Sequence, residues 1–346
     1  MGHIYIASAV ESLLARLSLF CLILAAWGQA LAGPAPIPVT VAMPGPGALP
    51  MLPLELMPRI GADKAEGIQL SIRYFGGGPL ALKDLLGRNS DFAALGMSAL
   101  AETRQIEGKA YSVASMVQVP AYTLMASNRL KDRVKSPRDL RGRTVGIHTA
   151  SKAGKSTGQH VAEFILLKDG VTAKEVNFIN TGQQHDSYAA SLLSGVADAI
   201  IANEPAASLL EKEGIAYRLA DLHDPATTRQ YLGSLFLYTQ LTTRQDVIQR
   251  QAGKVNRMVA ALIRTLRWMQ THSPNDIVDR LGISDTKARN AMILALEKNK
   301  TMFSPDGVFS EEQLRGTATL MQRIHTLPSA PDLTGLIAPQ WVGIRP

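Results

Sequence analysis

Short apolar stretches alternate with stretches of helical periodicity over most of this 346-residue chain. In the first third, strands are expected at Val39–Ala42, Ile68–Tyr74 and Phe92–Leu95. Helices are expected at Leu52–Glu66, between Pro79 and Leu86, and from about Ser98. Apolar runs that are bounded by glycine and proline and separated by helices are typical of a mostly parallel sheet. The pattern therefore predicts an α/β fold.

The same alternation returns in the second third of the chain. Two strands, Tyr111–Val119 and Tyr122–Ala126, are expected near a lobe boundary, and Ser136-Pro137 begins a short helix. The elements expected beyond it are strand Thr144–Ile147, helix Thr157–Lys168, strand Glu175–Ile179, helix Ser187–Leu193, strand Ala199–Ala202, helix Pro205–Glu213 and strand Tyr217–Ala220. Everything after Thr243 has a helical pattern: Gln245–His272, Pro274–Leu281, Asp285–Lys298 and Ser310–Thr326.

One segment of the pattern occurs twice. Leu85–Gly96 aligns without a gap on Leu192–Asn203, and each copy ends a helix, places an aspartate before a short apolar strand and stops that strand at a small or polar residue. Upstream, Val39–Ala42 corresponds to Thr144–Ile147. A duplicated unit implies two similar lobes with a cleft between them. The predicted lobe one is discontinuous, residues 37–125 and 236–346, and lobe two is residues 126–235.

Residues 1–32 have the pattern of a secretory signal peptide. Arg16 precedes the apolar run Leu17–Trp27, which is too short to span a bilayer, and Ala30-Leu31-Ala32 is a small-x-small cleavage site. An anchoring N-terminal helix is the alternative. Cleavage after Ala32 predicts a periplasmic protein. Because the single cysteine, Cys21, lies inside this segment, the mature chain would hold no disulfide, thiolate nucleophile or cysteine metal site.

The formal net charge of +7 changes this picture little. Lysine and arginine are scattered among acids rather than clustered with aromatic residues, which argues against nucleic-acid binding. The excess of positive charge is compatible with an anionic ligand or an acidic partner surface.

The sequence offers no constellation of catalytic or metal-binding residues. There is no His-Glu-x-x-His and no Gly-x-Ser-x-Gly, and Gly154-Lys155-Ser156 lacks the first glycine of a phosphate-binding P-loop because residue 149 is threonine. We therefore expect no enzyme activity, no cofactor and no metal. His148, at a strand end that faces the expected cleft, is expected to contact ligand or to lie on the surface.

Several segments resemble a known family. Lys135–Ile147, Leu192–Ala199, Asn203–Ala207, Gly76–Leu82 and Asp91–Gly96 are similar to the solute-binding proteins of nitrate, sulfonate, taurine and thiamine-precursor ABC importers. The resemblance implies a two-lobed periplasmic binding protein fold, type II-like, with a helical C-terminal region. It also implies a small-molecule ligand, an ABC permease as partner and a monomeric protein. Asn203 departs from the family, which often has an aromatic residue there.

Loops at the carboxyl ends of strands are the candidate ligand contacts, since ligands of open α/β sheets bind there. In lobe one these are Pro46, Gly47, Gly77, Gly78, Met97 and Ser98, and in lobe two Ser151, Ser156, Thr157, Gln183, Asn203 and Glu204. Each also has a structural alternative: the glycines form turns, Met97 packs in the core, and the serines and Glu204 begin helices.

The ligand expected from these features is a small organic anion, sulfonate-like or zwitterionic, held by the helix N-terminus near Ser151–Thr157 with Lys152 or Lys155 adding charge. A thiamine-precursor-like heterocycle is the alternative ligand. An exported ligand-reporting protein or an enzyme on the same fold is the alternative function.

Overall fold

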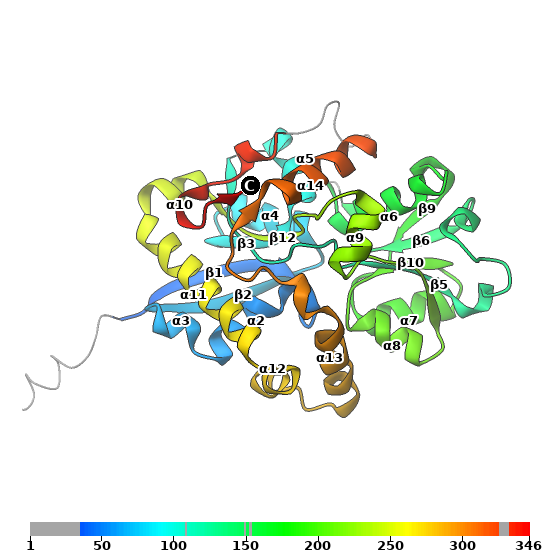
Figure 1. The fold of residues 1–346 in the computed structure, drawn as a ribbon, viewed down its shortest axis with the longest axis horizontal. Coiled ribbons are helices and arrows are strands. Elements are labelled where there is room, and N and C mark those ends of the chain that lie inside the picture. Colours follow the sequence, from blue (N-terminus) through cyan, green and yellow to red (C-terminus); the bar gives the residue numbers. More distant parts are fainter. Residues whose placement is uncertain (1–34, 108, 149, 152–153, 325–331) are drawn as a thin grey trace, which may run out of the picture. The chain divides into compact units, whose positions relative to one another are not determined.

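The computed structural model describes residues 35–107, 109–148, 150–151, 154–324 and 332–346. The chain divides into two units, Met1–Ile37 and Pro38–Pro346, and the larger unit holds all the described helices (Figure 1). The predicted signal peptide and Cys21 lie outside the described residues. No helix in the described part of the chain is long and apolar enough to cross a membrane.

The first sheet has the strand order β2-β1-β3-β12-β4. Strands β1 and β3 are parallel, whereas β12 runs antiparallel to both β3 and β4. Helix α4 packs on β3, and α2 and α3 pack against the long helix α11. The bounds are β1 Ile37–Pro44, α2 Leu52–Arg59, α3 Ala62–Ala65, β2 Ile68–Phe75, α4 Gly78–Leu86, β3 Phe92–Gly96, α5 Met97–Glu107, β4 Ala110–Ser115 and β12 Thr239–Arg244.

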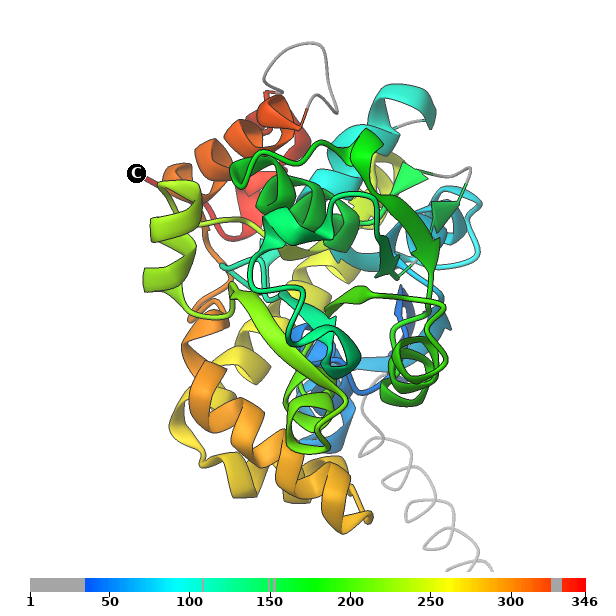
Figure 2. The same ribbon diagram turned by 90° about the vertical axis from the view of Figure 1, so that its right-hand side faces the viewer.

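The second sheet has the order β11-β5-β10-β6-β9. The lobe that contains it faces the viewer in Figure 2. Strands β6, β9 and β10 are parallel, and β5 is antiparallel to both of its neighbours. The bounds are β5 Thr123–Ser127, β6 Thr144–Ile147, α6 Thr157–Lys168, β9 Asn177–Asn180, α7 His185–Leu193, β10 Ala199–Ala202, α8 Ala206–Lys212, β11 Ala216–Asp221 and α9 Pro225–Leu232. A short hairpin, β7 Ala150–Ser151 and β8 Gly154–Lys155, precedes α6.

The duplication read from the sequence is present in the hydrogen bonds of both sheets. Asp91 accepts the backbone N–H of Thr40 through its carboxylate (3.0 Å) and donates its own N–H to the Thr40 carbonyl (2.9 Å). Asp198 makes the same two bonds with Thr144, at 3.1 and 2.9 Å. In each lobe, therefore, the aspartate just before the strand that follows a helix binds the backbone of the lobe's first strand, in the middle of β1 and at the first residue of β6.

Two crossover segments, residues 116–122 and 233–238, link the sheets. They pair with each other, because the N–H of Phe236 donates to the Gln118 carbonyl (3.3 Å) and that of Tyr238 to the Val117 carbonyl (3.1 Å). The exact division into lobes at 125/126 and 235/236 stays a prediction. The sheets place β5 entirely with the second lobe.

The C-terminal region corrects one expectation, since it is not wholly helical. Besides α10 Gln245–Arg250, α11 Ala252–Thr271, α12 Pro274–Leu281, α13 Thr286–Asn299 and α14 Glu311–Arg323, it holds the small parallel sheet β13 Phe309–Ser310 with β14 Ile344–Arg345. Two expected helices are also each divided in two. Gly61, in the left-handed region (φ 71°), separates α2 from α3, and Gln251 (φ −133°) separates α10 from α11.

Two of these late helices reach the second lobe. Helix α13 contacts α8, and Lys287 of α13 forms an ion pair with Glu213 just after α8 (Figures 1 and 2). Helix α14 contacts both α5 and α6 and packs closely on the second crossover. A Cβ at Gly316 of α14 would overlap the Leu235 carbonyl and the Ser234 side chain, so only glycine fits there.

Candidate functional site

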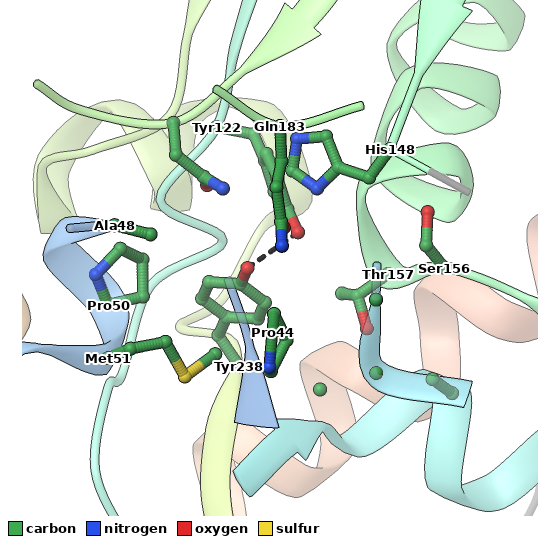
Figure 3. A pocket seen from close by; sticks show the side chains of 15 residues that line it. Pro44, Ala48, Pro50, Met51, Tyr122, His148, Ser156, Thr157, Gln183 and Tyr238 are labelled. Carbon is green, nitrogen blue, oxygen red and sulfur yellow. Dashed lines mark hydrogen bonds between the residues drawn. The ribbon is translucent and has the colours of Figure 1, made fainter. Parts of the chain in front are cut away.

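Strand-to-helix junctions of both lobes meet around one small cavity of about 20 Å³. Figure 3 shows tyrosines at its centre, with Pro50 and Met51 of the first lobe on one side and Ser156 and Thr157 of the second on the other. The complete lining is Pro44, Ala48, Pro50, Met51, Gly77, Gly78, Gly96, Ala99, Tyr122, His148, Ser156, Thr157, Gln183, Asn203 and Tyr238. A cavity of this size has room for about one water molecule, so this closed arrangement admits a solute only when the lobes move apart.

The N-terminus of α6 forms the second-lobe wall. Ser156 caps the helix by accepting the N–H of Gln159 (3.2 Å), and Thr157 follows as the first helical residue. Thr157 sits directly over the end of β3, where a Cβ at Gly96 would overlap its side chain. Glycine at position 96 therefore allows the two lobes to come together at this point.

Hydrogen bonds between the lobes surround the cavity. Gln183 donates from Nε2 to the Phe75 carbonyl (3.3 Å), and the N–H of Leu49 donates to the Glu204 carbonyl (2.9 Å). On the side of α5, Ser98 Oγ donates to Thr157 Oγ1 (3.1 Å). These contacts join the two lobes in a closed arrangement.

A buried histidine strengthens the same closure. His160 of α6 contacts Ser98 Oγ through Nδ1 and Glu102 Oε2 through Nε2, both at 3.0 Å, and the Lys155 N–H donates to the same Glu102 oxygen (3.2 Å). Burial alone would raise the pKa of Glu102, but the bonds from His160 and Lys155 outweigh it and hold that pKa below its ordinary value. The carboxylate of α5 is therefore charged when the lobes are closed.

Four aromatic rings cluster at the cavity. The Tyr122 ring lies 5.3 Å from that of His148 and 5.1 Å from that of Tyr238, and the Tyr188 ring lies 6.1 Å from His148 (centroid distances). Tyr238 donates its hydroxyl proton to Tyr122 Oη at 2.5 Å. Burial raises the pKa of all three tyrosines, so they remain neutral at physiological pH.

The described lining holds no aspartate, glutamate, lysine or arginine. Two charged residues next to lining residues in the sequence form ion pairs: Glu204 with Arg218 (2.8 Å) and Lys155 with Glu163 (3.0 Å). Burial also lowers the pKa of His148 from 6.5 to about 4, which leaves its ring uncharged. The described side chains thus form an electrically neutral wall. Within the described residues, no group of three or more metal-ligating side chains comes together either.

The structure brings about half of the sequence-predicted contacts together. Gly77, Gly78, Ser156, Thr157, Gln183 and Asn203 line the cavity. Met97 and Ser98 are buried beside it, Glu204 is held by Arg218 and Ser208, and Pro46 and Gly47 are exposed in the turn after β1. Ser151 belongs to β7, and its side chain is outside the described part. The contact of any of these residues with ligand stays a prediction.

Sequence reasoning missed Tyr122 and Tyr238, the two largest side chains of the lining. They come from the two crossovers and meet across 116 residues of sequence. His148 was the one ring that the sequence singled out, and the surface alternative for it is wrong because its side chain is buried. No local sequence pattern distinguishes these two tyrosines as site residues. Their only shared feature in the sequence is that each is the last crossover residue before a strand, β5 for Tyr122 and β12 for Tyr238.

Comparison with known proteins identifies the family. The model of the family described as NMT1/THI5 like matches residues 64–276. This chain belongs to the NMT1/THI5-like family. The match runs from α3 to the beginning of α12, so it contains both crossovers and all lining residues except those between Pro44 and Met51.

Individual relatives agree with the fold. The "Putative binding protein YtlA" of Bacillus subtilis (strain 168) is 23% identical over 286 residues, 80% of each chain. A solved protein of Bordetella bronchiseptica RB50 is similar with a TM-score of 0.77 at 23% identity, covering 90% of this chain and 97% of that one. The alkanesulfonate-binding protein SsuA of Xanthomonas axonopodis pv. citri, bound to MOPS, has a TM-score of 0.66 at 16% identity, covering 89% and 99%.

These likenesses confirm the fold class and the resemblance read from the sequence. The protein has the fold of periplasmic binding proteins: two mixed sheets, each flanked by helices and joined by two crossovers.

Proposed function

We propose that this protein captures a small organic solute in the cavity between its two sheets and delivers it to an ABC permease, without chemistry. The observation that carries the proposal is that the lining comes from both lobes, with Gly77 on one side and Thr157 and Asn203 on the other. A ligand that bridges both halves stabilises the closed form, and rotation about the crossovers releases it. The family and the structural relatives support the same role.

For the ligand, two classes follow from the sequence. The N-termini of α4 and α6 at the cavity favour the organic anion, because free N–H groups and the helix dipole attract negative charge. The neutral described lining argues against it, since Lys155 is paired with Glu163 and Lys152 is outside the described residues. The cluster of Tyr122, Tyr238 and His148 favours the alternative, a planar uncharged heterocycle, because aromatic walls stack on flat rings. We take the uncharged ring as the ligand class.

Export belongs to the same proposal. The Arg16-led apolar run and the Ala30–Ala32 site support cleavage after Ala32 and release to the periplasm. Mass spectrometry of exported protein should then find Gly33 at the N-terminus. A chain that retains Cys21 would contradict a cleaved, untethered form.

The binding cycle itself is tested by screening purified mature protein with matched solutes. The panel contains 4-aminopyrimidine, pyrimidine and benzamide as uncharged rings, and benzoate, benzenesulfonate, taurine and nitrate as anions. A ligand at about 100 times its Kd should stabilise the protein by roughly 2.7 kcal/mol, and small-angle scattering should show that this ligand compacts it. Stabilisation by anions alone, at low salt, would overturn the choice of an uncharged ring. A ligand that binds without making the protein more compact would contradict the proposal that the lobes close on the ligand.

A further inference from the structure

Most of the excess positive charge of the chain lies in one segment. Residues 128–143 hold seven arginines and lysines against two aspartates, so a net charge of +5 out of the chain's +7 is found there. Six of the seven basic side chains are exposed, and only that of Arg141 forms an ion pair with a described residue, Glu175 at 3.4 Å. Exposed charge that the protein itself does not pair attracts an oppositely charged partner. The basic residues are Arg129, Lys131, Arg133, Lys135, Arg138, Arg141 and Arg143.

Strand pairing places this basic segment at the edge of the second sheet that faces away from the cavity. The segment joins the end of β5 to the beginning of β6, and Ala199 at the beginning of β10 pairs with both Ala126 and Val145. The cavity lies at the opposite edge, where His148 follows β6 and Asn203 follows β10. In Figure 1 the segment is drawn in teal, beyond the second sheet on the side away from the first lobe. A partner bound there would leave the cavity unobstructed.

Two apolar side chains protrude beside this charge. Leu193 and Val196, in the turn between α7 and β10, are 61% and 60% exposed, more than any other large apolar side chain among the described residues. Arg129 lies against the same turn. Its Nε donates to the Leu192 carbonyl (3.0 Å), and its guanidinium would be 3.4–3.5 Å from a Cβ at Gly195. Apolar tips flanked by exposed cations are a combination with which proteins bind to the surface of a bilayer.

We propose that the basic segment and the Leu193–Val196 turn together bind an anionic phospholipid surface. The arginine and lysine side chains would face lipid phosphates, which carry negative charge and accept hydrogen bonds. The two apolar side chains would enter the headgroup region, and this distinguishes a lipid surface from an acidic protein or a nucleic acid, for which the charge alone would serve. Such binding concentrates an exported protein beside the membrane, and it goes beyond the capture of solute.

The first experiment measures binding to lipid vesicles by co-sedimentation. It uses the mature protein, so that the apolar run of the signal peptide cannot contribute. Vesicles that contain phosphatidylglycerol and phosphatidylcholine in equal parts should bind the protein at least about 10-fold more tightly than vesicles of phosphatidylcholine alone. Binding to the anionic vesicles should weaken as sodium chloride is added, because salt screens exposed charges.

Two sets of substitutions separate the contributions of charge and apolar contact. The combined variant Lys131→Gln, Arg133→Gln, Lys135→Gln removes three exposed charges and should weaken binding to anionic vesicles at least about 10-fold. The combined variant Leu193→Ser, Val196→Ser removes the apolar tips and should weaken binding about 5-fold. Its salt dependence should match that of the unsubstituted protein, since no charge is lost.

Each set has a matched control elsewhere on the surface. Lys64→Gln, Arg250→Gln, Lys298→Gln removes the same charge from exposed positions outside the basic segment, and Leu294→Ser removes an exposed leucine of α13. Both controls should change binding to anionic vesicles by less than about 2-fold. All the substituted side chains are exposed, so each variant should unfold at the same temperature as the unsubstituted protein.

Three results would overturn the lipid proposal. They are equal binding to the two kinds of vesicle, equal losses in the charge variant and its control, and unchanged binding in the variant that lacks Leu193 and Val196. Soluble polyglutamate and duplex DNA serve as the competing partners. If either binds as tightly as the anionic vesicles, the surface recognises negative charge in general and the lipid assignment is wrong. Solute-induced compaction is measured without vesicles, so its presence or absence decides the proposed function separately.

Discussion

At the scale of single residues, the neutrality of the cavity depends on His148. An imidazole in water would be partly protonated near pH 6.5, but burial lowers the pKa of this one to about 4. The groups that face it are Tyr122 and Tyr188, whose own pKa values burial raises, so no neighbouring charge compensates a proton on the ring. Protonation of His148 is therefore opposed by desolvation alone.

This predicts a specific pH dependence of stability. The unfolded chain takes up a proton on His148 near pH 6.5, whereas the folded protein does so only near pH 4. The stabilising contribution is therefore fully present above about pH 6.5 and is lost as pH falls toward 4, by about 3 kcal/mol in total. Denaturant titrations at several pH values should show a shallower decline for His148→Phe than for the unsubstituted protein. Equal slopes for the two proteins would contradict the depressed pKa.

At the scale of elements, the two lobes repeat one junction. The aspartate before β3 and the aspartate before β10 each accept the N–H of a threonine in the neighbouring parallel strand. A carboxylate in this position fixes the register of the strand pair, with Val41 opposite Phe92 and Val145 opposite Ala199. Asp91 is further held by Lys254 of α11 at 2.8 Å, an addition that Asp198 does not share in the described structure.

Removal of the Asp91 carboxylate and removal of the Asp198 carboxylate should therefore lower the free energy of unfolding by different amounts. Asp198→Ala loses one charge-assisted hydrogen bond and should lower the free energy of unfolding by about 1–2 kcal/mol. Asp91→Ala loses the same bond and also leaves the mostly buried ammonium of Lys254 unpaired, so its cost should be greater. Asp132→Ala, an exposed position, should change stability by less than about 0.5 kcal/mol. Denaturation midpoints at constant m-value provide the measurement, and equal losses for Asp91 and Asp198 would argue against the contribution of Lys254.

The same elements explain how much the sequence could predict. The positions of Asp91 and Asp198 before their strands were predictable because the segment around them is repeated, although their bonds to Thr40 and Thr144 span 51 and 54 residues. Apolar runs marked most strands of both sheets. The break at Gly61 was missed because the apolar pattern continues past it, whereas its backbone is in the left-handed region. The meeting of Tyr122 with Tyr238 depends on two crossovers far apart in sequence. The burial of His148 depends on the helix and tyrosines packed around it, so neither could be read from local composition.

At the scale of the whole molecule, closure rests on contacts between the lobes beside the cavity. Glu102 of α5 binds both His160 and the Lys155 N–H of the opposite lobe, and His160 is completely buried there. These bonds exist only when α5 and α6 are together. They stabilise the closed form, and a bound ligand adds to that preference.

Loss of this carboxylate should shift the balance between the open and closed forms. Glu102→Ala should increase the radius of gyration of the ligand-free protein in small-angle scattering. It should also weaken ligand binding several-fold, because a smaller fraction of molecules is in the closed form. The exposed Glu297→Ala serves as control and should change neither quantity. A Glu102→Ala protein with unchanged dimensions and affinity would show that the other interlobe bonds suffice.

The position of α13 has a consequence for how far the lobes can separate. In the sequence this helix follows β12, the last strand of the first sheet. Its Lys287 nevertheless forms an ion pair with Glu213 beside α8, and His185 Nε2 lies 2.7 Å from Oε2 of the same carboxylate. Among the described residues the two crossovers are then not the only links between the lobes, since α13 joins them by non-covalent contacts and also touches the short helix Leu49–Met51 beside the cavity. When the lobes rotate apart, either the Lys287–Glu213 ion pair must break or α13 must move together with the second lobe. The contact of α13 with α8 therefore helps to determine how far the lobes can open.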